Sequence, residues 1–247
     1  MPGYHCRVNK ASSFARCFAL VPCAGVGERA GQGAPKQYAP IGGRALVAHT
    51  LDALVRVQRL QATLVVLAPG DRQFAALAGG FDPARVWAAH CGGGTRAASV
   101  ANGLAELQRR GAAEEDWVLV HDAARCLLRP AWVDRLIDAC SGDAVGGLLA
   151  LPLSDTLKQG SQGRVQRTLP RADKWAAQTP QMFRLGQLRS ALQQAGADVT
   201  DEASALEALG AQPLLVPGEL ENFKITWPQD FALAARLLAT RTQEEAT

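Results

Sequence analysis

Short apolar runs recur along this 247-residue chain, and stretches with helical spacing separate them. The runs show little alternation of apolar and polar residues, which is typical of strands buried on both faces of a parallel sheet. Between the runs, apolar residues recur every three or four positions and so share one face of a helix. We therefore predict an α/β, Rossmann-like fold, with helices on both faces of a mostly parallel twisted sheet. The predicted strands are Phe18–Val21, Leu64–Leu67, Val86–Ala88, Trp117–Val120 and Val145–Leu151.

This alternation stops after Leu151, where two polar, strand-like segments flank a glycine-containing turn. A hairpin over Leu153–Lys158 and Arg164–Leu169 cannot bury itself within a parallel sheet, so we expect a projecting β-arm at 151–171. A projecting arm with apolar residues favours a partner subunit and predicts a homodimer. The elements predicted after the arm are helices at Leu185–Gln194 and Asp201–Leu209, a strand at Pro213–Val216 and a last helix from Pro228 to about Ala239.

Composition limits the class of protein. The net charge of +3 is too small to indicate a nucleic-acid partner, and the sequence contains no apolar run of the roughly 20 residues that span a bilayer. The six cysteines form no CxxC pair, which favours reduced thiols and a cytoplasmic location. No linker or repeat divides the chain, so we predict one domain over 18–247 and a disordered tail over 1–17.

A glycine-rich segment at 22–38 follows the first predicted strand. Glycine lets the backbone pass close to a ligand and turn its N–H groups toward phosphate. The stretch at 25–30 formally matches the dinucleotide fingerprint GxGxxA, but further glycines and a proline keep the chain irregular where a helix should begin. No acid follows the second strand to hold a ribose. Because the segment carries Arg29 and Lys36, it is better suited to a triphosphate, which accumulates charge as diphosphate departs.

Two further motifs follow later predicted strands. Three consecutive glycines and Ser99 stand before a predicted helix, in the stretch Cys-Gly-Gly-Gly-Thr-Arg-Ala-Ala-Ser-Val at 91–100. The stretch His-Asp-Ala-Ala-Arg at 121–125 follows the fourth strand. An acid at the carboxyl end of a buried parallel strand faces the crevice where open α/β sheets bind ligands. Asp122 is therefore suited to hold Mg²⁺ or to orient a substrate.

Together these motifs resemble the 2-C-methyl-D-erythritol 4-phosphate cytidylyltransferase family, within the nucleotidyltransferase superfamily. The likeness runs from about Phe18 to Leu238 and rests on PxAGxGxR…PKQY, GGxxRxxSV, HDAAR, TDEASALE and NFKIT. It implies a Mg²⁺-dependent enzyme that transfers a cytidylyl group from CTP to 2-C-methyl-D-erythritol 4-phosphate in non-mevalonate isoprenoid precursor biosynthesis. The products would be 4-diphosphocytidyl-2-C-methyl-D-erythritol and diphosphate. His121 is not required as a general base, because a phosphate nucleophile is already ionised at pH 7.

The resemblance also assigns roles to individual residues, and three positions depart from the family pattern. Gly94 and Thr95 replace residues that are often more polar, and Cys126 stands where proline is usual. The implied catalytic residues are Arg29, Lys36 and Lys224. The implied nucleotide-binding residues are Pro22, Cys23, Ala24, Gly25, Gly27, Gly93, Ser99 and Asp122, with Asp122 also the metal ligand together with the CTP phosphates. The implied acceptor-binding residues are Arg125, Thr156, Arg171, Thr179 and Thr200, of which Arg171 and Thr179 reach a neighbouring subunit's site.

Three alternatives stay open from the sequence. The nearest is a cytidylyltransferase for another polyol phosphate, such as ribitol 5-phosphate, because the nucleotide motifs do not separate the acceptors. A NAD-dependent oxidoreductase is disfavoured by the missing ribose acid. A non-catalytic, nucleotide-binding regulator is disfavoured because Arg29, Lys36, Asp122 and Lys224 are all present.

Overall fold

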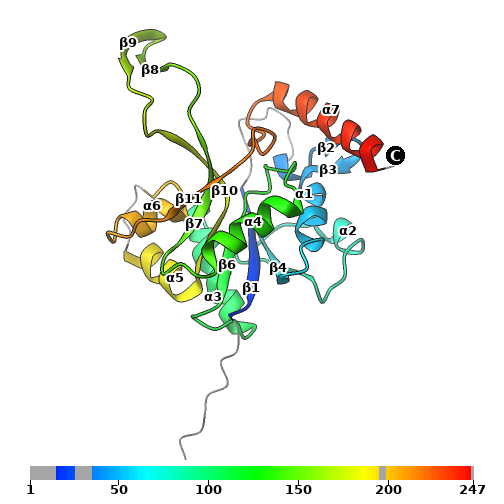
Figure 1. The fold of residues 1–247 in the computed structure, drawn as a ribbon. Coiled ribbons are helices and arrows are strands. Elements are labelled where there is room, and N and C mark those ends of the chain that lie inside the picture. The colour runs from blue at the N-terminus through cyan, green and yellow to red at the C-terminus, as the bar shows by residue number, and fades with distance from the viewer. Residues whose placement is uncertain (1–14, 26–34, 195–198, 246–247) are drawn as a thin grey trace, which may run out of the picture.

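A seven-stranded sheet forms the centre of the computed structural model, which describes residues 15–25, 35–194 and 199–245 (Figure 1). Its paired strands are parallel except at β10, which is antiparallel to both of its neighbours. The predicted α/β fold with a mostly parallel sheet is therefore confirmed. In spatial order the strands are β11 (Leu214–Pro217), β7 (Gly146–Pro152), β10 (Trp175–Arg184), β6 (Trp117–Val120), β1 (Cys17–Cys23), β4 (Leu60–Leu67) and β5 (Val86–Ala89).

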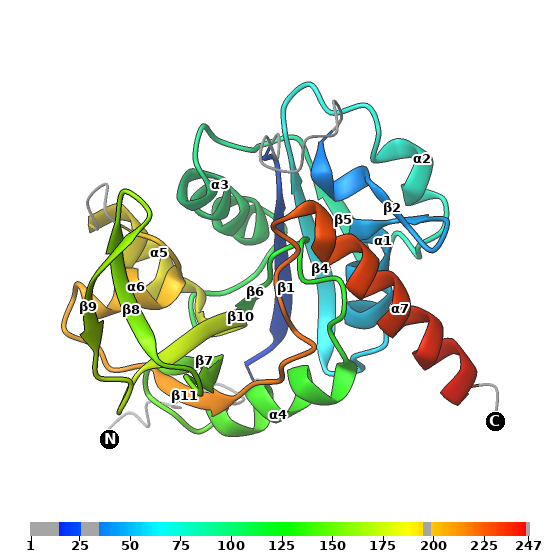
Figure 2. The same ribbon diagram turned by 90° about the horizontal axis from the view of Figure 1, so that it is seen from above.

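Helices cover both faces of the sheet, as Figure 2 shows on the two sides of β1. Alternate residues of β1 point to opposite faces, so Ala19 and Val21 join one apolar core while Phe18 and Leu20 join the other. Each core is closed by the apolar stripe of its helices, which is the arrangement that the spacing in the sequence predicted. On the first face lie α1 (Leu46–Val55) and α4 (Pro130–Cys140), and on the second α3 (Arg96–Arg109), α5 (Leu185–Gln194) and α6 (Glu202–Glu207).

A third, smaller core lies beneath the last helix, α7 (Pro228–Glu245). It joins Ile41, Leu127 and Ile225, which come from parts of the chain that are far apart in sequence. Cys126 is also buried there, so the residue that replaces the family's usual proline packs in an apolar cluster. Short elements complete this side: the 3-10 helix η2 (Lys36–Tyr38), β2 (Pro40–Ile41), β3 (Arg44–Ala45) and α2 (Ala75–Ala78).

The predicted arm is present as a separate two-stranded sheet of β8 (Leu157–Ser161) and β9 (Arg164–Leu169). It projects away from the body of the molecule (Figure 1). Its root is held by the pairing of Trp175 with Pro152 and by the Leu153 N–H, which donates to the carbonyl oxygen of Lys174 at 3.0 Å. Most of its side chains are exposed, including Val165 at 64%.

Most predicted elements are confirmed within one to a few residues, and two details differ. Strand β10 was not predicted, although it lies between β6 and β7 and makes the sheet mixed. Helix α6 begins at Glu202, one residue after the predicted start, because Asp201 is its N-cap. The tail at 1–14 lies outside the described residues, and the interpretation of residues 18–247 as one domain stays a prediction. No helix among the described residues has both the length and the apolarity needed to cross a membrane.

Candidate active site

A cavity of about 450 Å³ lies at the carboxyl ends of β1 and β6. The chain passes from β1 to β4 on one side and later to β6 on the other, so the order of strands reverses here. Such a reversal leaves a crevice in which open α/β sheets bind ligands. The cavity is lined by Pro22, Cys23, Ala24, Gly25, Lys36, Gln37, Gly93, Gly94, Thr95, Arg96, Ser99, Asp122, Ala123, Ala124 and Lys224.

Asp122 is held between two cations at the end of β6. Its Oδ1 accepts a hydrogen bond from Arg96 Nε and its Oδ2 accepts one from Lys224 Nζ, both at 2.8 Å. Burial by itself would raise the pKa of Asp122, but the charges of Arg96 and Lys224 outweigh burial and hold that pKa below its ordinary value. The carboxylate therefore stays ionised at neutral pH.

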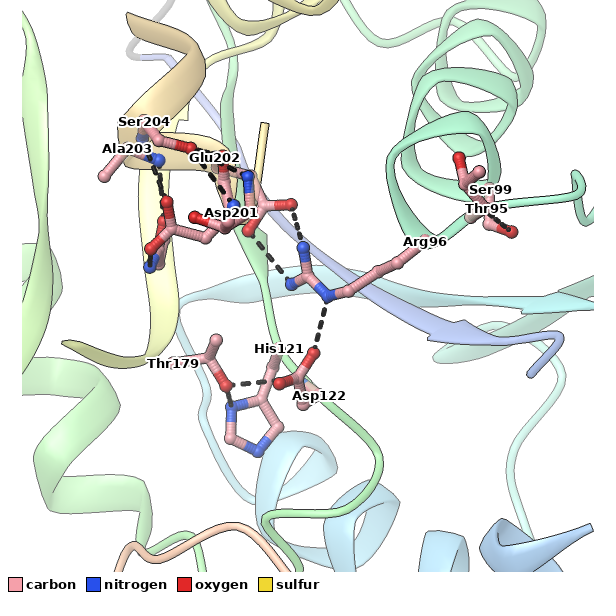
Figure 3. Close-up of polar contacts among 12 residues, drawn as sticks. Thr95, Arg96, Ser99, His121, Asp122, Thr179, Asp201, Glu202, Ala203 and Ser204 are labelled. Atoms are coloured by element: carbon pink, nitrogen blue, oxygen red, sulfur yellow. Dashed lines mark hydrogen bonds and ion pairs between the residues drawn. The ribbon is translucent and has the colours of Figure 1, made fainter. Parts of the chain in front are cut away.

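Arg96 reaches a second carboxylate on the far side of the site, as Figure 3 shows. Its Nη1 and Nη2 donate to the two carboxylate oxygens of Glu202 at 2.7 and 3.0 Å. Glu202 has no exposed side-chain surface, whereas the Arg96 side chain is 27% exposed and lines the cavity. Planar guanidinium and carboxylate groups match each other in such paired contacts, which fixes their relative orientation.

A buried hydrogen-bond chain lies beneath Asp122. Its backbone N–H donates to Thr179 Oγ1 at 3.1 Å, and that hydroxyl lies 3.0 Å from His121 Nδ1. His121 Nε2 lies 3.1 Å from the carbonyl oxygen of Arg125, which can only accept, so Nε2 carries the proton and Thr179 donates to Nδ1. Burial lowers the pKa of His121 to about 4. His121 is thus a neutral support under the site, which agrees with its exclusion as a general base.

The two glycine-rich segments meet at the rim of the cavity. A Cβ atom at Gly92 would overlap the Cβ of Ala24 and lie 2.8 Å from the carbonyl oxygen of Leu67, so this approach requires glycine. Ser99 Oγ accepts a hydrogen bond from the Gly93 N–H at 3.0 Å. Thr95 caps α3, since its side chain accepts from the Ala98 N–H. These bonds shape a backbone turn at the start of a helix, which is a favourable place for an anion.

Lys36 also lines the cavity. Its Nζ donates to the carbonyl oxygen of Ile225 at 2.7 Å, which ties the glycine-rich segment to the stretch that carries Lys224. The neighbouring Gln37 donates from Nε2 to the carbonyl oxygen of Cys23 at 3.0 Å. Burial raises the pKa of the Cys23 thiol, so this cysteine is a poor nucleophile.

The structure brings some of the predicted site residues together and leaves others apart. Around the cavity lie Lys36, Lys224, Asp122, Pro22, Cys23, Ala24, Gly25, Gly93 and Ser99. Arg29 and Gly27 lie outside the described residues. None of the predicted acceptor-binding residues lines this cavity within the described chain; they are Arg125, Thr156, Arg171, Thr179 and Thr200.

The residues of that second set occupy different surroundings. Arg125 donates to the carbonyl oxygens of Asn222 and Ala177, at 2.6 and 3.2 Å, and so ties three parts of the chain together. Thr179 is buried below Asp122. Thr156 and Arg171 are exposed at the arm, and Thr200 is exposed before α6. Within a single chain none of these side chains lines the cavity, and their binding roles stay predictions.

Two residues that the prediction gave no role are central to the geometry. Arg96 lines the cavity and contacts Asp122, and Glu202 holds the other side of Arg96. The available signal was that each is a charged residue in the first turn of a helix, within a stretch that matches a family motif. Nothing in the local sequence pairs them, because 106 positions separate them.

A doubly wound sheet with glycine-rich segments and cations around a cavity at its strand ends is the architecture of nucleotide-binding α/β enzymes. Within that class, residues 17–240 match the family model described as 2-C-methyl-D-erythritol 4-phosphate cytidylyltransferase. The chain belongs to this family.

Individual relatives agree with the family match. The chain is 52% identical over 242 residues to the 2-C-methyl-D-erythritol 4-phosphate cytidylyltransferase of Ralstonia nicotianae, covering 94% of this chain and 96% of that one. It is 59% identical over 239 residues to the bifunctional enzyme IspD/IspF of Albidiferax ferrireducens, covering 97% of this chain but 57% of that enzyme's length. A crystal structure of 4-diphosphocytidyl-2C-methyl-D-erythritol synthase matches with a TM-score of 0.81 and 42% identity, covering 91% of this chain and 99% of that one.

Proposed function

We propose that this chain is a nucleotidyltransferase that transfers the cytidylyl group of CTP to 2-C-methyl-D-erythritol 4-phosphate. The products are 4-diphosphocytidyl-2-C-methyl-D-erythritol and diphosphate, in the non-mevalonate synthesis of isoprenoid precursors. The observation that carries the proposal is the ionised Asp122, held between Arg96 and Lys224 in a cavity bordered by two glycine-rich segments. Family membership supplies the identity of the two substrates.

The nucleotide occupies the cavity in this proposal, with its phosphates along the backbone of Pro22–Gly25 and Gly93–Ser99. Support comes from Gly25 and Gly94, where the absence of a side chain lets a ligand approach the backbone, and from the start of α3, where the helix dipole favours an anion. Lys36 and Lys224 both line the cavity, and Lys36 Nζ bonds to the carbonyl oxygen of Ile225, next to Lys224, so an α-phosphate beside them would meet two positive charges. Arg29 belongs to the same proposal through the family motif alone, since it lies outside the described residues.

Transfer proceeds by attack of an acceptor phosphate oxygen on the α-phosphorus of CTP, in line with the departing diphosphate. The P–O bond to diphosphate breaks as the new P–O bond forms, and the cations stabilise the charge that accumulates on both groups. The acceptor phosphate is ionised at neutral pH and needs no general base. His121 supports this reading, because its low pKa and burial leave it neutral and away from solvent.

A divalent cation fits the site only with help from the nucleotide. Among the described residues no group of three or more His, Cys, Asp or Glu is placed to hold a metal ion, and Asp122 alone among the described cavity residues carries a carboxylate. Mg²⁺ commonly combines one or two carboxylates with substrate phosphates and water. We therefore assign the metal to the CTP phosphates with Asp122 as its protein ligand. When bound, it would neutralise phosphate charge.

The acceptor is held across a homodimer in this proposal, in which Thr179 and Arg171 reach a neighbouring subunit's site and the arm supplies Thr156 and Arg171. Their exposure on a hairpin that projects from the body supports a role toward a second copy, since neither lines the cavity of its own chain. Arg125, Thr179 and Thr200 complete the assigned acceptor set. A cytoplasmic location is supported by the cysteines of the described residues, all of which are free thiols.

Diphosphate release with CTP and Mg²⁺, measured against a panel of polyol phosphates, tests the function. We expect release with 2-C-methyl-D-erythritol 4-phosphate, and release only with ribitol 5-phosphate would overturn the choice of acceptor. Lys36→Ala should lower turnover by about two orders of magnitude, because it removes a charge that stabilises the transition state. The midpoint of thermal unfolding should change little. Turnover near that of the unmodified enzyme would remove Lys36 from the assigned catalytic set.

A further inference from the structure

Glu202 is a buried acidic residue behind the cavity; burial raises its pKa and the charge of Arg96 opposes that rise. Its side chain has no exposed surface, and it is not among the residues that line the cavity. Burying a carboxylate is unfavourable unless the group is paired and hydrogen-bonded. The partner here is Arg96, so the question is what this pair does for the cavity.

The guanidinium of Arg96 divides its donors between two carboxylates. The Nη1 and Nη2 groups both serve Glu202, and Nε serves Asp122 at 2.8 Å. Because the guanidinium is rigid and planar, fixing its outer edge on Glu202 also fixes the direction in which Nε points. Asp122 therefore receives one hydrogen bond whose direction is set from outside the cavity.

Helix α6 is itself anchored to the sheet beside Asp122. Gln181 of β10 donates from Nε2 to Asp201 Oδ2 and accepts from the Ala203 N–H, both at 2.8 Å. In the sheet Gln181 pairs with Val120, which ends β6 and lies two positions before Asp122. Glu202 stands between Asp201 and Ala203, so its carboxylate has a fixed position relative to the end of β6 (Figure 3).

We propose that Glu202 is a positioning residue: through the guanidinium of Arg96 it sets the orientation of Asp122 and thereby of the Lys224 ammonium. The four side chains form a neutral group of two cations and two anions joined in one line. In this arrangement Arg96 Nη1 and Nη2 donate to Glu202 and not to a ligand phosphate. Lys224 stays bonded to the other oxygen of Asp122. The expected effect on turnover rests on the proposed function, whereas the orientation of Asp122 by Glu202 and Arg96 does not.

The first test compares Glu202→Gln with Glu207→Gln. Both changes remove one negative charge from α6, but Glu207 is exposed and has no contact with Arg96 among the interactions described. The glutamine amide nitrogen would face one of the Arg96 donors and break the paired contact. We expect Glu202→Gln to lower kcat by about tenfold to a hundredfold with KM for CTP changed less than about threefold. Glu207→Gln should leave both values unchanged.

A double-mutant cycle separates positioning from a general structural effect. If Glu202 acts through Asp122, adding Glu202→Gln to Asp122→Asn should cause little further loss of kcat. A full additional loss in that background would overturn the proposal, as would an unchanged kcat in a folded Glu202→Gln variant. If Glu202→Gln does not fold, Arg96→Lys replaces it in the cycle, because lysine keeps the charge but cannot bridge both carboxylates.

A second measurement is independent of turnover. In the ¹⁵N spectrum of the unmodified protein, the Arg96 Nε–H should exchange slowly with solvent, and Arg96→Lys identifies its signal. Glu202→Gln should speed that exchange at least tenfold, while Glu207→Gln should not. Equal exchange in the two variants would overturn the positioning role even with normal enzyme activity. Conversely, lack of turnover of 2-C-methyl-D-erythritol 4-phosphate by the unmodified protein would overturn the proposed function and leave this result standing.

Discussion

The cations of the cavity and those of the arm lie in opposite settings. Lys224 and Arg96 are ion-paired to a buried carboxylate at 2.8 Å, and their positions are set within one chain. On the arm, Lys158 donates to Thr168 and Arg167 to Gln159, across a hairpin that is open to solvent. The first group has a fixed geometry before any ligand arrives, and the second has only local partners.

This difference indicates two ways of building a phosphate site. Charges that must act in the transition state gain most from a geometry fixed in advance, since no reorganisation is then needed during the reaction. Exposed cations contribute little to the stability of their own chain. In our proposal Arg171 is the arm cation that acquires a role from a partner subunit, so changes in the two regions should have different consequences.

Among changes in the two regions, Lys224→Ala should have the largest effect on turnover. It removes the cation that both holds Asp122 and faces the cavity, and we expect turnover to fall by about a hundredfold to a thousandfold. Lys158→Ala on the arm is the matched control and should change turnover less than about twofold. Steady-state diphosphate release measures both. A comparable loss in the two variants would contradict the distinction between the regions.

Acid should weaken the buried network and leave the arm unaffected. The pKa of His121 falls from an ordinary value of 6.5 to about 4 on burial, so the unfolded chain binds a proton in this range that the folded chain does not. The free energy of unfolding therefore has its full value above pH 6.5. It decreases as the pH falls toward 4, by roughly 3 kcal/mol in all.

Denaturant titrations at several pH values should show this slope, and His121→Asn should reduce it. His90→Asn, at an exposed position, is the control and should keep the slope of the unmodified protein. The arm at 151–171 contains no histidine, so its removal should not alter the slope. If His121→Asn keeps the full slope, His121 in the hydrogen-bond chain beneath Asp122 is not the group whose protonation causes the pH dependence of stability.

Arg171→Ala should give the smallest of these effects, and it tests the arm rather than the cavity. Loss of one guanidinium contact to the acceptor phosphate should raise KM for 2-C-methyl-D-erythritol 4-phosphate by about tenfold. KM for CTP and the midpoint of unfolding should stay the same, because the side chain is exposed in its own chain. Arg164→Ala, elsewhere on the hairpin, should change neither KM. An equal effect at the two positions would mean that the arm acts only through its overall charge.

The sequence predicted those parts of the fold that depend on local pattern. Buried parallel strands and amphipathic helices have periodicities that can be read directly, and so does the polar hairpin of the arm. Strand β10 lacked that signal because its middle contains the buried polar residues Gln178, Thr179 and Gln181. Their hydrogen-bond partners, such as Asn222 and Asp201, lie far along the chain, so the burial of these residues becomes evident only in three dimensions.

The candidate site divides in the same way. Lys36 and Asp122 could be predicted because they stand in a glycine-rich segment and directly after a strand, and Lys224 because its stretch NFKIT resembles a family motif. The contact of Arg96 with Glu202 could not, since it depends on where α3 and α6 lie on one face of the sheet. The proposed contact of the arm with the cavity of a second copy depends on the surface between the two copies, which the pattern of one chain does not describe.

The closed root of the arm has a consequence for modularity. The two ends of the arm are joined by backbone pairing of Trp175 with Pro152 and by the hydrogen bond from Leu153 to Lys174. A tight turn would hold the ends of β7 and β10 together in the same way. Because the ends already lie side by side, the sheet does not depend on the length of chain beyond them, and each doubling of that length costs only about 0.6 kcal/mol in loop-closure entropy. The arm can therefore lengthen, shorten or change its sequence while the cavity stays folded, which leaves acceptor recognition free to vary separately from nucleotide binding.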